Sequence, residues 1–213
     1  MRTTSFVVLL LATVGLALAA VLDRGGRESV PNGAGTAGET AEATFAGGCF
    51  WCVEEAFDGV PGVVSTTSGY TGGTTRDPSY EEVSSGGTGH AEAVRVAYDA
   101  EVTSYERLLD AFWRNVDPTD GGGQFCDRGD SYRSAIFTHD DEQRQLAEAS
   151  KRALEGSGHF EEPIATEVVR VGPFYPAEEY HQDYYRKNPV RYKLYKWNCR
   201  RAQRLEQIWG EKP

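Results

Sequence analysis

The segment of residues 47–52 (Gly-Gly-Cys-Phe-Trp-Cys) constrains this chain most, because a strand pattern ends there and a helix pattern begins. Residues 43–46 (Ala-Thr-Phe-Ala) are typical of a short strand, and apolar side chains at helical spacing over 50–57 predict a helix. Cys49 then lies at a helix N-terminus, where free N–H groups and the helix dipole favour the thiolate over the thiol. The turn therefore predicts a reactive cysteine.

The N-terminus has the pattern of an export signal. An uncharged apolar run over residues 6–20 follows Arg2 and contains Ala-Leu-Ala at 17–19, which predicts a signal peptide over residues 1–19. An uncleaved membrane anchor is the alternative, although the run is short for a span of about 20 residues. We expect an exported, periplasmic protein, or else a domain anchored outside the cytoplasm.

Composition divides the rest of the chain. Residues 20–42 are rich in Gly, Glu, Thr and Ala and predict a flexible linker, which leaves one domain over 43–213. The formal net charge is −10 and no basic block interrupts it, which argues against nucleic acid as a partner. The locally basic stretch at 186–204 is interpreted as a solvated helix face with a buried stripe.

The secondary-structure patterns mix strands and helices without a strict βαβ rhythm. We therefore predict an α+β two-layer sandwich of ferredoxin-like type, with helices packed on a mixed sheet. Two long glycine-rich loops are expected to share one sheet edge with the Cys49 turn. The further predicted strands are 62–70, 93–98, 134–138 and 165–171, and the two loops are 71–90 and 117–131. The further predicted helices are 103–113, 140–155 and most of the C-terminal part. A capping box from Thr103 to Glu106 opens the first of these helices.

Four cysteines, Cys49, Cys52, Cys126 and Cys199, allow three disulfide connectivities, and export favours disulfides. The Cys-x-x-Cys spacing at a helix start is typical of a dithiol redox centre. A structural disulfide within this pair would close too small a loop to constrain the unfolded chain. A zinc site would need a second ligand pair that is not evident. We interpret Cys49 and Cys52 as a redox pair and expect no metal or cofactor.

Three further groups are candidates for chemistry. Glu92 enters a strand after a glycine-rich loop, and burial would make it a general acid by raising its pKa. Asp127 lies in an Asp-Arg-Gly-Asp loop of a kind that is usually a solvated turn. His181, expected on an aromatic-rich helix, is typical of a structural histidine.

Together these segments resemble the peptide-methionine (S)-S-oxide reductase (MsrA) family. Five separated motifs occur in the order of that family, which makes accidental similarity very improbable. They are residues 48–51 (Gly-Cys-Phe-Trp), 80–83 (Tyr-Glu-Glu-Val), 89–92 (Gly-His-Ala-Glu), 127–134 (Asp-Arg-Gly, then Tyr-Arg-Ser) and 180–182 (Tyr-His-Gln).

The resemblance implies a role for each matched residue. Cys49 would attack the sulfoxide sulfur of an oxidised methionine, take over the oxygen as a sulfenic acid and release methionine. The sulfoxide oxygen is a poor leaving group, so the reaction needs a proton donor, and Glu92 matches the residue that has this role in the family. Tyr80 and Tyr132 match the phenols that hydrogen-bond the oxygen, and Asp127 lines the same pocket.

The resemblance also implies a substrate pocket and partners. Phe50 and Trp51 would form an apolar wall for the substrate methyl group. A pocket that binds the methyl group at one place and the oxygen at another accepts only one sulfoxide epimer, and the resemblance implies the S form. Oxidised proteins would be the substrates and a thioredoxin-like dithiol the reductant. We expect a monomer.

The sequence departs from the family pattern near its C-terminus. Many members carry a recycling cysteine soon after the dipeptide that matches Asn188-Pro189, where this chain has none. Cys52 is then the expected resolving thiol; Cys199 is the other candidate, by relay or by direct attack, unless it pairs with Cys126. Two other functions stay open: a general exported thiol–disulfide oxidoreductase using Cys49 and Cys52, and a binding module with an aromatic surface over 174–197.

Overall fold

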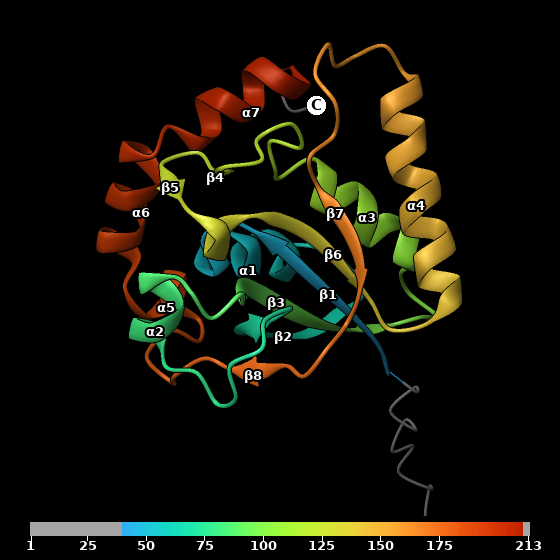
Figure 1. Ribbon diagram of the computed structural model, residues 1–213. Coiled ribbons are helices and arrows are strands. Elements are labelled where there is room, and N and C mark those ends of the chain that lie inside the picture. Colours follow the sequence, from blue (N-terminus) through green and yellow to red (C-terminus); the bar gives the residue numbers. More distant parts are fainter. Residues whose placement is uncertain (1–39, 211–213) are drawn as a thin grey trace, which may run out of the picture. The chain divides into compact units, whose positions relative to one another are not determined.

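The computed structural model describes residues 40–210 (Figure 1); the predicted signal peptide and nearly all of the predicted linker lie outside them. β1 begins three residues before the predicted domain boundary. The elements are β1 Thr40–Gly47, α1 Phe50–Asp58, β2 Val63–Thr71, α2 Tyr80–Ser85, β3 Ala91–Asp99, α3 Tyr105–Trp113, β4 Gly123–Gln124, β5 Asp127–Arg128, the 3₁₀ helix η1 Asp130–Tyr132, β6 Ser134–Thr138, α4 Asp141–Gly156, β7 Glu167–Arg170, β8 Tyr175–Pro176, α5 Tyr184–Lys187, α6 Pro189–Asn198 and α7 Arg201–Trp209.

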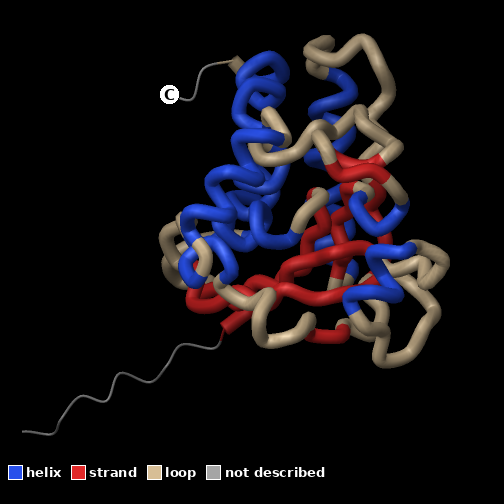
Figure 2. Tube along the Cα trace, turned by 90° about the vertical axis from the view of Figure 1, so that its left-hand side faces the viewer, coloured by secondary structure: helices blue, strands red, loops and turns tan. Residues whose placement is uncertain are grey.

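The main sheet has the strand order β7-β6-β1-β3-β2-β8 and is mixed, because β6 and β7 are parallel and the other pairs antiparallel. The run β1-α1-β2-β3-α3-β6 gives the central order β6-β1-β3-β2, the split βαβ arrangement of ferredoxin-like folds. The predicted α+β class and the predicted central strands are confirmed. Figure 2 shows the strands crossing the domain with helices packed around them.

The main core lies between the sheet and helices α1, α3 and α4. Phe45 on β1 stacks on Phe57 of α1 and Phe112 of α3, with ring centroids 4.7 and 5.3 Å apart. The other sheet face carries a smaller cluster of alanines around Phe137, covered by Val171 and others. Strand alternation therefore gives each face its own apolar set.

Three local predictions were wrong. Ser104, not Thr103, caps α3, and the capping box lies instead at Ser79 and Glu82, where it opens α2 inside the predicted loop 71–90. That helix is too short to show an apolar period. His181 lies in a turn over 179–183 rather than on a helix. Among residues 40–210, no helix has the length and apolar character needed to cross a membrane.

Gly48 makes the turn between β1 and α1 possible. Its φ is +82°, and a Cβ there would lie 2.6 Å from Cβ of Gln124. Gln124 cannot retreat easily, because its amide accepts from the Asp117 N–H at 2.8 Å and donates to the Asp117 carbonyl at 2.7 Å. Loop 117–131 thus lies directly against the Cys49 turn.

We predict that Gly48→Ala destabilises the fold more than Gly86→Ala. Both glycines have nearly the same positive φ, +82° and +83°, but nothing lies within 4 Å of a Cβ at Gly86. A positive φ strains alanine at both sites, and crowding against Gln124 adds about 1–3 kcal/mol at Gly48 alone. Urea unfolding of both variants measures the difference; equal losses would contradict the close approach.

Candidate active site

Cys49 and Cys52 form a buried pair of free thiols at the start of α1. Cys49 is the N-cap residue, directly after the Gly47-Gly48 turn, and its carbonyl accepts the Cys52 N–H at 3.0 Å. Their exposed fractions are only 5% and 4%. The predicted helix-start position of Cys49 is therefore confirmed, in a site largely shielded from water.

The protonation of the pair differs from the sequence expectation. Burial, followed by the neighbouring Cys52, raises the pKa of Cys49 well above its usual value. A hydrogen bond from Cys49 lowers the pKa of Cys52 to about 6, with help from Arg201, Tyr192 and Lys196. In the reduced pair the negative charge is thus centred on Cys52. Desolvation outweighs the helix N-terminus at Cys49, whereas the positive charges of Arg201 and Lys196 act on Cys52.

Glu92 stands beside the nucleophile as a protonated carboxyl group. It lies on β3, is 2% exposed, and its Oε2 accepts the backbone N–H of Phe50 at 3.0 Å. Burial, with smaller contributions from the charges of Asp127 and Cys52, raises its pKa to about 8 against the lowering effect of the Phe50 hydrogen bond. At neutral pH Glu92 carries a proton that it can donate.

Two phenols approach the same point from different loops. Tyr80 begins α2, where its backbone N–H is held by Glu178 at 2.9 Å, and Tyr132 ends η1. Burial and then the charge of Glu92 raise the pKa of Tyr80 to about 12 and raise that of Tyr132. Both hydroxyls keep their protons at neutral pH. The charge of Cys49 acts on both phenols, so the two loops and the Cys49 turn meet, as predicted, although the meeting place is the end of the sheet where the central strand β1 ends and β3 begins.

The aromatic wall is larger than the predicted Phe50 and Trp51. Phe50 is 1% exposed, so the half-buried Trp51 offers most of the open surface. Trp51 stacks on Tyr184 with centroids 3.8 Å apart, and its Nε1 donates to Nδ1 of His181 at 3.1 Å. His181 is buried against these rings. Sequence reasoning missed Tyr184; its only signal was the aromatic run over 174–197.

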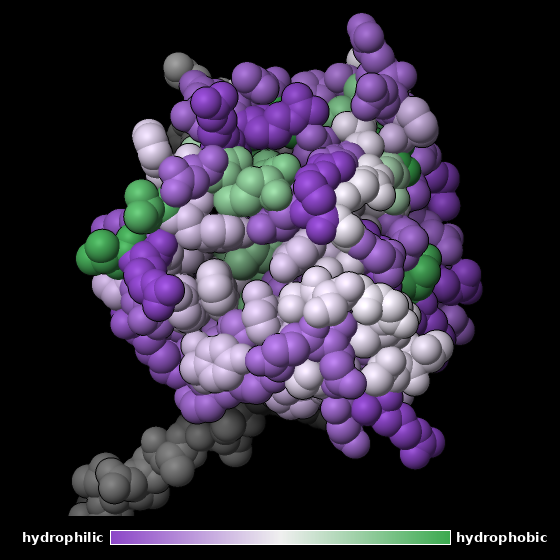
Figure 3. Space-filling view, turned by 60° about the vertical axis from the view of Figure 1, so that its left-hand side comes forward, coloured by the Kyte–Doolittle hydropathy of each residue, from purple (hydrophilic) through white to green (hydrophobic). Residues whose placement is uncertain are grey.

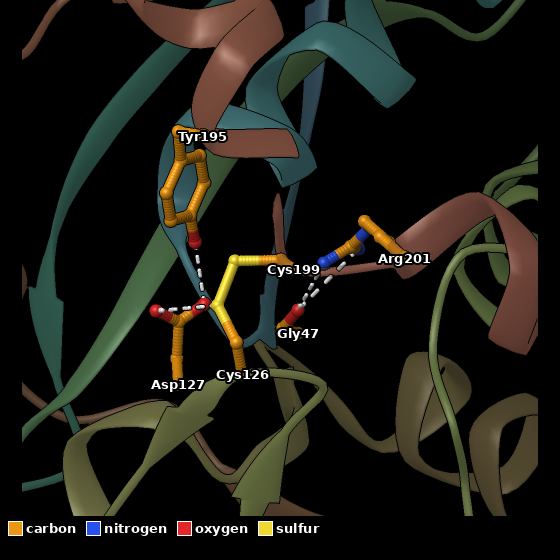
Figure 4. The surroundings of a disulfide bond; sticks show 6 residues. All are labelled: Gly47, Cys126, Asp127, Tyr195, Cys199 and Arg201. Atoms are coloured by element: carbon orange, nitrogen blue, oxygen red, sulfur yellow. Dashed lines mark hydrogen bonds between the residues drawn. A yellow bond between two sulfur atoms is a disulfide. The ribbon is translucent and has the colours of Figure 1, made fainter. Parts of the chain in front are cut away.

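A disulfide between Cys126 and Cys199 borders the site. It joins the loop between β4 and β5 to the C-terminal end of α6, with Cα atoms 4.8 Å apart (Figure 4). Cys199 therefore pairs with Cys126, one of the possibilities that the sequence left open, and Cys49 and Cys52 are the free cysteines of the described residues. The donor atoms of Cys126, Asp127 and Cys199 lie within 4.8 Å of one another, a spacing compatible with a metal ion, but the disulfide engages both sulfurs.

The disulfide holds α6 over the thiols. Tyr195 donates to Oδ2 of Asp127 at 2.5 Å, and the presence of its hydroxyl near Cys49 lowers the pKa of that thiol. Burial raises the pKa of Asp127, against this bond. The opposite face of α6 is solvated, with Leu194 and Trp197 exposed. Figure 3 shows mostly polar atoms, in purple, on this side, with apolar atoms, in green, in small separate patches.

A buried cysteine at a helix start, with a second free thiol, a protonated carboxyl group, two phenols and an aromatic wall around it, is the arrangement expected of a thiol-based oxidoreductase. The family model described as "Peptide methionine sulfoxide reductase" matches residues 41–213. This chain belongs to the peptide methionine sulfoxide reductase family and is an enzyme of that class.

Individual relatives agree. The peptide methionine sulfoxide reductase MsrA of Bacillus licheniformis is 58% identical over 170 residues, covering 80% of this chain and 94% of that protein. MsrA of Bacillus subtilis is 54% identical, covering 80% and 96%. Among solved structures, methionine sulfoxide reductase A of Corynebacterium diphtheriae has a TM-score of 0.64 and 36% identity, covering 73% and 78%. Mxr1 from Saccharomyces cerevisiae in reduced form has a TM-score of 0.63 and 34% identity, covering 70% and 86%.

Glu92 should make the fold less stable at higher pH. Its pKa in the folded protein, about 8, lies above the ordinary 4.5, so its contribution is full below pH 4.5 and lost as pH rises through 8. Relative to Glu92→Gln, the wild type should lose about 1.4 kcal/mol of unfolding free energy per pH unit between pH 5 and 8. Urea unfolding at several pH values measures this. The exposed-site control Glu81→Gln should parallel the wild type, and a parallel Glu92→Gln curve would refute the buried acid.

Proposed function

We propose that this protein reduces methionine S-sulfoxide in oxidised proteins, and the free amino acid as well, to methionine at the expense of thiols. One observation carries the proposal: a protonated Glu92 carboxyl is held on the Phe50 N–H, one residue from Cys49. Sulfur attack on a sulfoxide needs both a nucleophile and an acid for the oxygen. General disulfide exchange needs no such acid.

In the first step Cys49 attacks the sulfoxide sulfur and passes its proton to Cys52. Glu92, with the hydroxyls of Tyr80 and Tyr132, supplies hydrogen bonds and a proton to the oxygen as negative charge develops there. The oxygen is transferred to Cys49, which becomes a sulfenic acid, and methionine leaves. One thiol and one sulfoxide give one sulfenic acid and one thioether. The proton that Glu92 gave to the oxygen is replaced from solvent, while the former Cys49 proton stays on Cys52 for the second step.

In the second step Cys52 resolves the sulfenic acid. Its sulfur attacks the sulfur of Cys49, a disulfide forms, and the hydroxyl leaves as water with the Cys52 proton. The pairing of Cys199 with Cys126 supports Cys52 in this role, since both thiols of the Cys-x-x-Cys pair are free and buried side by side. Disulfide geometry permits a bond across this spacing at a helix start.

The pocket supports selection of one epimer. A substrate methyl group would contact the Trp51 ring, beside Tyr184, while the oxygen points to Glu92 and the two phenols. The two substituents of a chiral sulfoxide cannot be exchanged without placing the methyl group against buried polar groups, which is costly. This arrangement and the family resemblance both favour the S form.

Each turnover oxidises two thiols, so the enzyme needs a dithiol reductant, and we propose a thioredoxin-like protein. We also propose that the reaction takes place outside the cytoplasm, in the periplasm. The apolar N-terminal sequence supports this, as does the Cys126–Cys199 disulfide, because such bonds persist in oxidising compartments.

Turnover of a methionine S-sulfoxide peptide with dithiothreitol tests the function. Cys49→Ser should abolish it, and Glu92→Gln should lower kcat by about 10²–10⁴, the usual contribution of a general acid. Glu81→Gln is the matched control and should keep wild-type activity. Wild-type inactivity on both epimers would refute the proposal. Insulin reduction that is insensitive to Glu92→Gln, without sulfoxide turnover, would favour the oxidoreductase alternative.

Mass mapping after one turnover without reductant tests the resolving thiol. We expect a Cys49–Cys52 disulfide beside an unchanged Cys126–Cys199 bond, and accumulation of the Cys49 sulfenic acid in Cys52→Ser. If a Cys49–Cys199 bond formed in Cys52→Ser as fast as the wild-type disulfide, Cys52 would not be the resolving residue.

A further inference from the structure

Arg201, the first residue of α7, is a buried cation without an acidic partner. Its side chain is 3% exposed, and its guanidinium donates to backbone carbonyls, that of Asn115 at 2.5 Å and that of Gly47 at 3.4 and 3.5 Å. Among residues 40–210, no carboxylate oxygen lies within 4.0 Å of it. Buried charges are normally paired, because an isolated charge in a protein interior is costly.

The two acids on which the charge of Arg201 acts, Glu55 and Asp127, are engaged with other partners. Glu55 binds the Tyr192 hydroxyl at 2.6 Å and pairs with Lys196. Asp127 accepts the Tyr195 hydroxyl. The remaining anion near Arg201 is the thiolate of the cysteine pair, whose Cys52 member is stabilised by the charge of Arg201.

The surroundings of Arg201 aim it at the nucleophile turn. Figure 4 shows its guanidinium pointing to the Gly47 carbonyl, one residue before Gly48-Cys49. Its other face lies on the Phe125 ring, 4.3 Å from the centroid. Phe125 adjoins Cys126, and the disulfide to Cys199 fixes the chain two residues before Arg201. The disulfide and the ring together leave the guanidinium little freedom.

We propose that Arg201 is a positioning residue of the dithiol site: it holds the Gly47 carbonyl, and with it the turn presenting Cys49, and supplies the positive charge that balances the single thiolate of the pair. This rests on the proposed thiol chemistry, in which Cys52 resolves the sulfenic acid. A guanidinium suits both tasks, because it donates several fixed hydrogen bonds while staying charged.

Other titratable groups act on the same thiols, or on the side chains that bind them, and all of them are kept intact in the variants compared below. They include hydroxyls, carboxyls and one further cation. They are Glu55 on α1, Tyr80 on α2, Glu92 on β3, Asp127 on β5, Tyr132 on η1, and Tyr192, Tyr195 and Lys196 on α6.

Thiolate absorbance at 240 nm, titrated against pH with Cys126–Cys199 intact, tests the proposal. A protein lacking both thiols, Cys49→Ser with Cys52→Ser, is subtracted to remove the tyrosine signal. We expect Arg201→Met to raise the midpoint by one pH unit or more, which lowers the thiolate fraction about tenfold below the midpoint, and Arg201→Lys to keep it. Arg204→Met is the matched control, because Arg204 also lies on α7 but pairs with Asp117. The midpoint of the thiolate titration should be the same in Arg204→Met as in the wild type.

An unshifted midpoint in folded Arg201→Met would overturn the proposal. The titration uses no sulfoxide, so it stays decisive even if sulfoxide reduction fails. Should Arg201→Met not fold, the wild type serves: the Nε–H resonance of Arg201, assigned by its loss in Arg201→Lys, should shift with the midpoint of the thiolate. A resonance that stays fixed through that titration would equally overturn it. Arg201→Lys should also slow the single-turnover rate severalfold, since lysine cannot hold both carbonyls.

Discussion

The hydrogen bond from the Phe50 N–H to Glu92 joins the two halves of this site. It brings a strand carboxyl group onto the N-terminus of the helix that begins after Cys49, in the interior where neither group meets water. The bond requires β1 and β3 to be neighbours in the sheet, and it requires the Gly48 turn that starts α1 beside them. The ferredoxin-like strand order therefore positions acid and nucleophile before any loop contributes.

Burial then sets the protonation of the site, in the direction expected for Glu92 and against the direction expected for Cys49. A helix N-terminus favours a thiolate, and a carboxyl group in water is ionised at neutral pH. Here desolvation keeps protons on Glu92 and Cys49, and the charge moves to Cys52, near Arg201 and Lys196. This distribution suits the proposed reaction, in which the Glu92 proton goes to the sulfoxide oxygen and the Cys52 thiolate accepts the proton of Cys49. The same low-dielectric surroundings make each positive charge near the pair more effective.

Much of the fold and site was predictable from local patterns. The alternation along β3, the apolar spacing of α1 and the glycine pair before Cys49 predicted the elements that carry the main chemistry. The family motifs singled out Glu92, Tyr80 and Tyr132, and in the structure the charge of Glu92 acts on both phenols. The capping box of α3 was misplaced because Thr103 and Ser104 both match the cap pattern, and only the backbone angle and the hydrogen bond to Arg107 distinguish them. The short helix α2 was missed because a few residues show no period.

The sequence by itself, through its local motifs and their resemblance to the family, predicted the chemistry proposed above: which residue attacks, which acid assists and which aromatic residues receive the methyl group. The tertiary structure decided the rest. It selected Cys126–Cys199 from three connectivities, brought Tyr184 and Tyr195 to Trp51 and Asp127, and placed Arg201 beneath the Gly47 turn. These contacts join residues 68 to 154 positions apart, and nothing in a local pattern encodes such a distance. Protonation likewise depends on burial, which exists only once the chain has folded.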